Sequence, residues 1–227
     1  MPMPQLHPDL YALPPMRALL ASESAVLAPE LARSTGDHAL HIAPVPEITP
    51  PPLPLLGRWA RLHLAHGGWQ GDVQARADEP LPFQDDAFGV VVLRHAAEIV
   101  PDGDELIGEA ARVLAPGGVL AITGVHPVSA WAPWFQWRAR GTRASLRQPV
   151  LLRSACGRAD LHVIAVHRAG HVLPSVMTGE GSSLAGGAYI LLARKQRIAA
   201  TPLRVIKTAN APVQSGSLVS GARRAAR

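Results

Sequence analysis

The sequence contains one cysteine and no long apolar run, and both absences limit what the protein can be. Cys156 stands alone among 227 residues, so no internal disulfide can form, as is typical of proteins from a reducing compartment. No stretch reaches the roughly 18 consecutive apolar residues that a membrane-spanning helix needs. The first residues show no charged leader followed by an apolar core, so we expect no signal peptide. We therefore expect a cytoplasmic protein without membrane contact.

Acidic residues are absent after Glu180, and this absence explains the net charge of +5. Eight lysines and arginines follow that residue, whereas residues 1–180 carry 14 bases against 17 acids, a net charge of −3. The high isoelectric point therefore does not indicate a basic groove on the folded part. From Thr208 onward there is little to bury, so we expect a disordered basic tail at 208–227 that contacts nucleic acid weakly at most.

Several common catalytic signatures are also missing. The sequence has no GxSxG elbow, no GxxxxGK[ST] phosphate loop, no GxGxxG after a strand and no HExxH metal motif. Asp85-Asp86 and the pair Asp102 and Asp104 have the spacing of turn and cap carboxylates, not of an acid/base pair. We expect no metal site.

The central block of the chain predicts a strand, a helix and a second strand. The run at 90–93 is apolar, β-branched and too short for a helix, so it predicts a buried strand. Asp102 followed by Glu105 resembles a capping box, and Pro116-Gly117-Gly118 should end the helix before a second buried strand at 119–123. These elements fit a right-handed βαβ unit with parallel strands.

Shorter patterns predict the remaining elements. Alternation of polar and apolar residues predicts strands at 38–43, 59–64, 72–77 and 161–167, and the apolar run at 188–193 is expected to be another strand. Helices are expected at 16–33, kinked or divided by Pro29, and at 148–157. The tryptophan-rich segment 129–141 should be a loop that either lines a substrate pocket or packs over the sheet edge.

With these elements in order, the chain resembles the class I S-adenosylmethionine-dependent methyltransferases, in particular the small bacterial type 11 domains. The matching motifs are Leu81-Pro82-Phe83, Phe88, Arg112-Val113-Leu114 with the Pro-Gly-Gly stop, and Tyr189 to Lys195 near the end. The resemblance implies a single doubly wound, mostly parallel α/β sheet of the Rossmann-like type with about seven strands. It also implies an N-terminal helical segment at 1–37 and a methyltransferase-like domain at 38–207.

The resemblance implies S-adenosyl-L-methionine as the cofactor, bound across the carboxyl ends of the strands. By matched position, Leu81 flanks the adenine and Arg94 faces the cofactor. Ala43 ends the first strand, and Asp78 substitutes for an acid expected at Ala77. The catalytic candidates are His95, just past the strand at 90–93, and His126 on the side of the methyl acceptor, whose identity the sequence does not reveal.

The chain departs from the family where the cofactor turn should be. His41 to Pro46 contains no glycine, and proline offers neither an amide donor nor access to positive φ. The acid that should end the second strand is replaced by Leu64-Ala65-His66. Two hypotheses follow: a methyltransferase acting on an unknown acceptor, or a non-catalytic descendant that serves as a binding or scaffold module.

Four histidines stand at or just past the predicted strand ends: His41, His66, His95 and His126. Such ends share one rim in a doubly wound sheet, where histidines are able to bind a metal or an anionic ligand or to act as a base, although no metal-ligand spacing supports the first of these. The alternative is that they are ordinary polar residues of loop ends.

Overall fold

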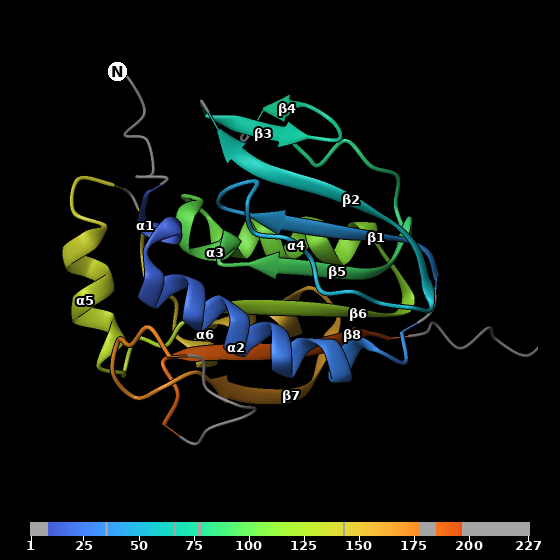
Figure 1. Ribbon diagram of the computed structural model, residues 1–227. Helices are drawn as coiled ribbons and strands as arrows, with labels where there is room; N and C mark the ends of the chain where they lie inside the picture. The colour runs from blue at the N-terminus through green and yellow to red at the C-terminus, as the bar shows by residue number, and fades with distance from the viewer. Residues whose placement is uncertain are drawn as a thin grey trace, which may run out of the picture.

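The computed structural model describes residues 9–34, 36–65, 67–76, 79–142, 144–177 and 185–196. These residues form one eight-stranded sheet in the order β4-β3-β2-β1-β5-β6-β8-β7, with helices on both faces (Figure 1). The four central strands are parallel: β2 (Leu56–Ala65), β1 (Gly36–Ala43), β5 (Phe88–Arg94) and β6 (Leu114–Val125). The predicted α/β class is confirmed, with one strand more than expected.

The central β5-α4-β6 unit confirms the prediction for this block. Strand β5 is buried along 90–93, and helix α4 (Gly103–Val113) connects it to the parallel strand β6. Asp102 caps the helix: its Oδ1 atom accepts hydrogen bonds from the amides of Asp104 at 2.9 Å and Glu105 at 3.1 Å. These bonds satisfy two amides that the first turn of a helix otherwise leaves without partners.

The Pro-Gly-Gly stop behaves differently from the prediction. The helix ends at Val113 and β6 begins at once, at Leu114, so that 116–118 lie inside the strand. Phe88 pairs with Leu114 and Val90 with Val119, and the register shift between the two pairs marks a bulge. Gly117 adopts a φ of 82°, which a residue with a side chain rarely reaches, and this explains why the bulge falls on the glycines.

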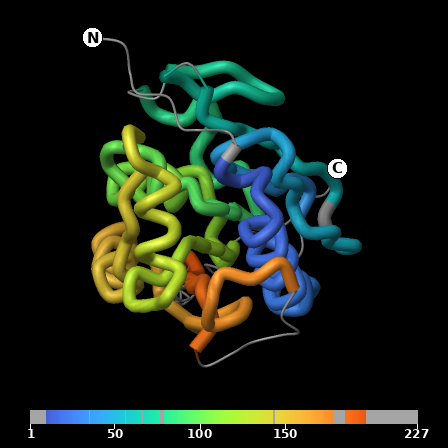
Figure 2. The backbone as a smooth tube through the Cα atoms, turned by 60° about the vertical axis from the view of Figure 1, so that its left-hand side comes forward, coloured from blue at the N-terminus to red at the C-terminus, as the bar shows by residue number. Residues whose placement is uncertain are grey.

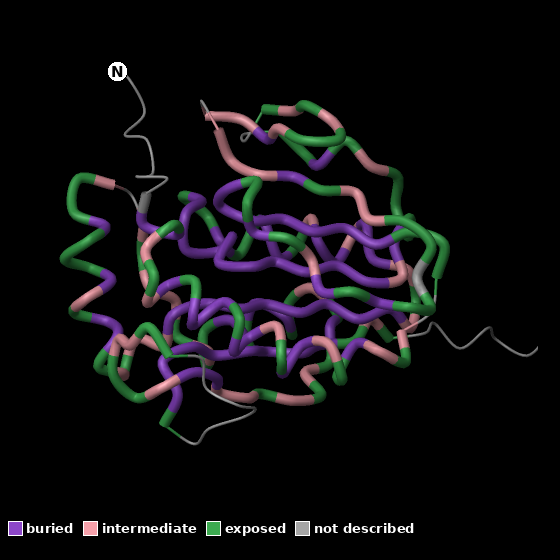
Figure 3. The backbone as a smooth tube through the Cα atoms, in the orientation of Figure 1, coloured by how far each residue is buried: buried purple, intermediate pink, exposed green. Residues whose placement is uncertain are grey.

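Helices cover the two faces of the sheet separately. Helix α2 (Pro14–Leu31) packs on one face, while α4 and α6 (Pro149–Arg158) pack on the other. Figure 2 shows α2 on the opposite side of the strands from the green-to-yellow helices, and Figure 3 shows the strands buried between them. Strand alternation supplies both faces: Val90 and Val92 pack with the α2 side, whereas Val91 and Leu93 pack with the α4 side. Pro29 lies within α2 without dividing it.

Antiparallel strands complete both ends of the sheet. Strands β8 (Ala188–Lys195) and β7 (Leu161–Ala169) follow β6, close to their predicted bounds. On the other side, β2 turns at Gly67 directly into β3 (Gly68–Gly71), and β4 (Ala75–Arg76) follows. The strand predicted at 72–77 is present only in part, as β4, and the glycines expected to form the turn before it instead begin and end β3.

Three short helices lie near the carboxyl ends of the parallel strands: α1 (Asp9–Ala12), α3 (Ala96–Ile99) and α5 (Trp131–Arg138). The loop expected at 129–141 is thus largely helical. Trp131 and Phe135 of α5 are buried, whereas Trp137 is 53% exposed. Packing over the sheet therefore accounts for the first two aromatic side chains.

Helix α2 shares its core with the strands, so residues before 38 and after it pack together. The division of the chain at residue 37 stays a prediction, and the tail at 208–227 lies outside the described residues. Within the described ranges, no helix is long and apolar enough to cross a membrane.

Candidate active site

The carboxyl ends of β2, β1, β5 and β6 meet at one rim of the sheet (Figure 1). These strands end at Ala65, Ala43, Arg94 and Val125. Ligands of open α/β sheets bind at such a rim, next to the point where the strand order reverses. In this sheet the reversal lies between β1 and β5, so the residues that follow these two strands define the candidate site.

Four charged side chains form a fully buried group behind this rim. We call Glu23, Arg94, His95 and Glu98 the charged cluster; each side chain is at most 3% exposed. The His95 imidazole bridges two carboxylates, with Nε2 at 2.8 Å from Glu23 and Nδ1 at 2.9 Å from Glu98. Arg94 Nε lies 3.3 Å from the second oxygen of Glu23. Two acids therefore face two bases in a region without water access.

The charged cluster shifts the pKa values of its own members. Burial works to lower the pKa of His95, but the carboxylates of Glu23 and Glu98 outweigh burial and raise the pKa to about 10. Burial works to raise the pKa of Glu23, yet His95 and then Arg94 lower it below its ordinary value of 4.5. The pKa of Glu98 is raised, because burial there exceeds the influence of His95. His95 is therefore an imidazolium at neutral pH.

Local structure explains why these side chains converge. Strand alternation directs Arg94, like Val90 and Val92, toward α2. His95 follows with a φ of 53°, a left-handed conformation that is rare for a residue with a side chain and that ends the strand. Glu23 lies on the buried side of α2, where the oxygen of its carboxylate also accepts a bond of 3.1 Å from the Thr123 hydroxyl.

Each nitrogen of the Arg94 guanidinium has a hydrogen-bond partner in this arrangement. Besides Glu23, its guanidinium donates to the Leu20 carbonyl, to the Ser24 hydroxyl at 2.9 Å and to the Thr49 carbonyl at 3.3 Å. The side chain thus connects α2, β5 and the segment after β1. The predicted roles of Arg94 in cofactor binding and of His95 in catalysis stay predictions, and the contacts give both residues a structural role.

The segment after β1 is packed with apolar side chains. Ala43 and Val45 are 1% and 7% exposed, and they belong to a core cluster with Tyr11, Leu20 and Ile48. Helices α1 and α2 therefore cover the end of β1. Ala43, predicted to contact the cofactor, is therefore buried beneath α1 and α2.

Leu81 is held from α4 by a pair of charged side chains. Its amide donates to Glu109 at 2.8 Å, and its carbonyl accepts from Arg112 at 2.9 Å. Arg112 also donates to the Phe83 carbonyl at 2.9 Å and to Asp85 at 2.6 Å. The Leu81 side chain is 3% exposed and packs in the core. Its proposed contact with adenine is untested, and Asp78 lies outside the described residues.

The structure gives the histidines separate environments. His41 is buried beside Trp59, and burial, followed by the charge of Arg94, lowers its pKa to about 3. His126 is partly buried, and its Nδ1 accepts a bond of 3.1 Å from the Val128 amide. Burial, followed by the charge of Arg168, lowers the pKa of His126, so its imidazole is neutral at pH 7. His66 lies outside the described residues. Among the residues described, no three His, Cys, Asp or Glu side chains are grouped to hold a metal ion.

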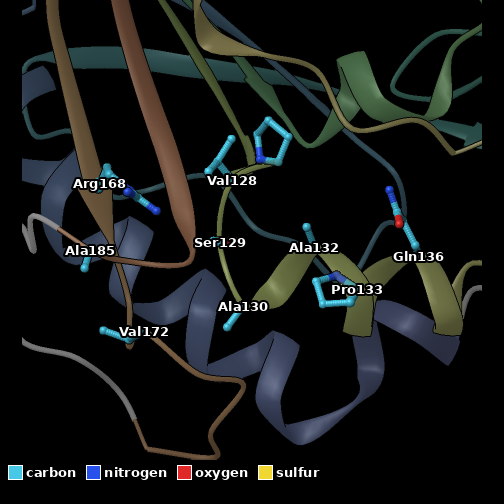
Figure 4. Close-up of a pocket in the computed structure, with 10 residues that line it drawn as sticks. Val128, Ser129, Ala130, Ala132, Pro133, Gln136, Arg168, Val172 and Ala185 are labelled. Carbon is cyan, nitrogen blue, oxygen red and sulfur yellow. The ribbon is translucent and has the colours of Figure 1, made fainter.

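A pocket of about 600 Å³ opens next to the end of β6 (Figure 4). We call it the β6–α5 pocket. Its wall consists of Pro127, Val128, Ser129, Ala130, Ala132, Pro133, Gln136, Arg168, Val172 and Ala185. His126, predicted for the acceptor side, immediately precedes this wall. Helix α5 thus contributes to a pocket through Ala132 and Gln136, and the tryptophans of α5 do not line it.

Comparison with known proteins agrees with this fold. A family model described as "Methyltransferase domain" matches residues 58–122, from β2 to β6. The chain is 39% identical over 56 residues to the phthiotriol/phenolphthiotriol dimycocerosates methyltransferase 1 of Mycobacterium ulcerans (strain Agy99), a match covering 25% of this chain and 21% of that enzyme. It is 35% identical over 79 residues to the probable methyltransferase 2 of the same name and organism, covering 35% of this chain and 28% of that protein. The matches thus span between a fifth and a third of these relatives.

Solved structures show the same fold over most of the chain. A SAM-dependent methyltransferase and possible histamine N-methyltransferase from Thermotoga maritima superposes with a TM-score of 0.58 at 14% identity, covering 83% of this chain and 94% of that one. A putative methyltransferase from Bacillus halodurans C-125 superposes with a TM-score of 0.54 at 18% identity, covering 74% of this chain and 96% of that one.

Residues 58–122 thus match a methyltransferase domain, and the fold of the chain is that of S-adenosylmethionine-dependent methyltransferases, for which the resemblance implies S-adenosyl-L-methionine as the cofactor. The resemblance deduced from the sequence is confirmed.

The residues at the rim suit S-adenosyl-L-methionine beside β5 and β6 but not beside β1. Beside β5 and β6, the hydroxyls of Tyr11 and Tyr189 are buried without a hydrogen-bond partner among the described residues, as expected where a polar group is to be held. Beside β1 the residues do not fit, because Pro44 has no amide to offer and apolar side chains cover the strand end. The glycine-containing turn that, by the resemblance, would bind the methionine part of the cofactor is therefore missing after β1.

Sequence analysis missed the acids of the charged cluster. Glu23 carried a signal, because it lies on the otherwise apolar side of the predicted N-terminal helix, and a buried carboxylate requires a cation. Glu98 carried none, since it lies between the predicted strand at 90–93 and the predicted helix after Asp102, where the sequence shows no pattern of burial.

Proposed function

We propose that the protein transfers a methyl group from S-adenosyl-L-methionine to an acceptor bound in the β6–α5 pocket. The observation that supports this proposal is the match of residues 58–122 to the methyltransferase domain, since these residues include β2 and β5, two of the strands that end at the rim. Methyl transfer depends chiefly on positioning the acceptor in line with the donor. The pocket lies next to the rim, on the β6 side, where an acceptor would approach.

Cofactor binding requires a local opening in this proposal. The apolar cover over Ala43 and Val45 occupies the space next to the end of β1. Tyr11 and Ile48 would have to move away, and the free energy of that opening lowers the apparent affinity. We therefore expect weak binding of the free cofactor.

Calorimetric titration of the full chain with S-adenosyl-L-methionine and S-adenosyl-L-homocysteine tests the proposal. We expect heat of binding and a raised melting temperature, because a ligand at 100 times its dissociation constant stabilises the folded state by about 2.7 kcal/mol. Ala65→Trp should weaken binding, since this half-exposed residue ends β2 at the rim. Gln74→Trp is the matched control on an exposed position before β4.

The absence of both heat and thermal stabilisation at millimolar concentrations would overturn the proposal. The protein would then use the methyltransferase fold as a binding or scaffold module, and the packed end of β1 would be consistent with that use.

We also propose that the protein works in the cytoplasm and has no specific nucleic-acid partner. The single cysteine, Cys156, supports this location, because a chain without an internal disulfide is typical of a reducing compartment. Fractionation of cells expressing a tagged full chain checks the location. RNA binding that disappears on deletion of 208–227 would instead assign a partner to the tail.

A further inference from the structure

The β6–α5 pocket has the size of a small-molecule site and a mostly apolar wall. Its volume of about 600 Å³ falls within the roughly 300–1,000 Å³ of typical ligand sites. Of the ten described residues that line it, seven are proline, valine or alanine. Figure 4 shows Val128, Pro133 and Val172 around an open centre, and these residues come from three segments of the chain. A ligand in this pocket would therefore place most of its surface against apolar side chains.

Two of the three polar side chains in the wall already bind the protein itself. The Ser129 hydroxyl donates to the His126 carbonyl at 2.6 Å, and Arg168 Nε donates to the Gly186 carbonyl at 3.0 Å. The third is Gln136, which lies on the side of the pocket opposite Arg168 (Figure 4). The described wall therefore offers a ligand chiefly apolar contact.

Exposed apolar side chains gather next to the opening of this pocket. Val128 and Val172, which belong to the wall, are 77% and 53% exposed. Trp137 lies four residues after Pro133 on α5, so it continues the same side of that helix beyond the pocket. The segment that follows the wall after β7 adds exposed Leu173, Val176 and Met177. Such a concentration of exposed apolar side chains marks a surface that binds an apolar partner.

We propose that the β6–α5 pocket binds a lipid-like molecule whose hydrocarbon chain lies against Val128, Pro133 and Val172. Burial of a chain is favourable in proportion to the apolar area removed from water, so this wall favours a long chain over a short or polar ligand. A chain longer than the pocket would leave it over the exposed apolar side chains next to the opening. The inference deepens the proposed function by naming the class of methyl acceptor, and in that respect it rests on the proposed function.

Uncharged alcohols of increasing length test the proposal on the full chain: hexan-1-ol, heptan-1-ol, octan-1-ol and nonan-1-ol. Binding is followed by chemical-shift changes of backbone amides, and those of Val128, Ser129 and Gln136 should shift. We expect the affinity to rise about fourfold with each added CH₂ group, since each group removes further apolar surface from water. Octane-1,8-diol should bind about tenfold more weakly than octan-1-ol, because its second hydroxyl would enter an apolar environment.

Variants at exposed positions locate the binding site without putting the fold at risk. The double variant Val128→Ser with Val172→Ser should weaken nonan-1-ol about tenfold, because two apolar contacts of the chain are lost. Val150→Ser is the matched control and should leave the affinity unchanged, since this valine is 72% exposed on α6 outside the pocket. Ala130→Asp adds a charge at an exposed position of the wall and should weaken all four alcohols.

Equal affinity for the four alcohols, or no binding of nonan-1-ol, would overturn the proposal. Equal losses in the double variant and in Val150→Ser would also overturn it, because the alcohols would then bind outside the pocket. The probes need no cofactor, so the two proposals fail separately. Chain-length-dependent binding without any S-adenosylmethionine binding would keep the lipid site and remove its role as an acceptor site. Cofactor binding without dependence on chain length would keep the methyltransferase and remove the lipid site.

Discussion

At Glu23, one carboxylate holds together residues that are far apart in the chain. Its two oxygens contact His95, Arg94 and the hydroxyl of Thr123. Removing such charges from water costs several kcal/mol per ion, and their mutual attraction offsets that cost only when the geometry is good and all partners are present. The buried pairs are therefore interdependent: each charge is tolerable only because the others are there.

The charged cluster should make stability depend on pH. The folded-state pKa of His95, about 10, lies above its ordinary value of 6.5, so its stabilising contribution is complete below pH 6.5 and is lost as the pH rises through 10. Glu98, whose pKa is also raised, acts in the same direction, whereas Glu23, whose pKa is lowered, loses its contribution only as the pH falls below 4.5. We expect the free energy of unfolding, measured in urea, to fall between pH 6.5 and 10.

The Glu23→Gln variant is the comparison for this measurement, since Cys156 also titrates at high pH in both proteins. Loss of one of two carboxylates leaves the cations of Arg94 and His95 partly uncompensated. We expect a cost of about 3–5 kcal/mol at pH 7 and a shallower decline toward pH 10. Parallel pH curves for the two proteins would show that the cluster is not the source of the decline.

Among the elements, helix α4 both supports the sheet and fixes the segment that precedes β5. Arg112 reaches the carbonyls of Leu81 and Phe83 and the carboxylate of Asp85, while Glu109 accepts from the Leu81 amide. The Leu-Pro-Phe and Arg-Val-Leu motifs of the sequence are thus two halves of one contact. The sequence motifs that indicated the family are thus the residues that join α4 to the segment before β5.

Arg112→Lys and Arg112→Gln should both destabilise the protein, by about 1–3 kcal/mol, because two partly buried carbonyls lose their donor. Lysine should rescue little, since a single ammonium group cannot match the planar guanidinium fork. Urea unfolding measures the change. Arg158→Gln is the control: its ion pair with Asp104 is exposed on both sides and should contribute less than about 1 kcal/mol. Wild-type stability in Arg112→Lys would contradict this account.

The sequence was most informative where periodicity and burial agree. The apolar run of β5 and the cap and face of α4 predict their elements because local pattern and long-range packing coincide. Helix α5 escaped prediction because it contains Pro133 and aromatic residues on several sides, and distant contacts decide which of them are buried. Strand β3 escaped because its flanking glycines resemble a turn, although a side chain at Gly71 would collide with the backbone of Arg61.

The candidate site was harder to predict than the fold. Residues 23 and 94–98 come from separate elements, and no spacing in the sequence relates them. Matched family positions led to Arg94 and His95, but their neutralisation by α2 is a tertiary contact that neither motif nor periodicity contains.

On the scale of the whole molecule, helix α2 covers a large part of one face of the sheet. Helix α2 is the long helix on its side of the sheet among the described residues, opposite α4 and α6. Met16, Leu27 and Leu31 are completely buried in it. The predicted domain boundary at residue 37 therefore assigns α2 to a different unit from the strands on which this helix packs.

Deleting residues 1–37 should prevent folding, because the apolar face of the sheet under α2 would be exposed and the cations of Arg94 and His95 would lose the carboxylate of Glu23. Deleting 208–227 is the control and should leave the melting temperature unchanged. Near-ultraviolet circular dichroism and binding of a hydrophobic dye distinguish a packed core from an unfolded or loosely packed chain. A cooperative transition in residues 38–207 alone would show that they form an independent domain.

The charged cluster also has a consequence for how this chain can diverge. A change at Glu23, Arg94, His95 or Glu98 alone leaves a buried charge uncompensated, whereas replacing the whole group by apolar residues of similar volume is often neutral or favourable. Single substitutions in the charged cluster are therefore destabilising, whereas replacement of all four residues together is tolerated. Among descendants of this sequence, the two acids and two bases should be inherited together or disappear together.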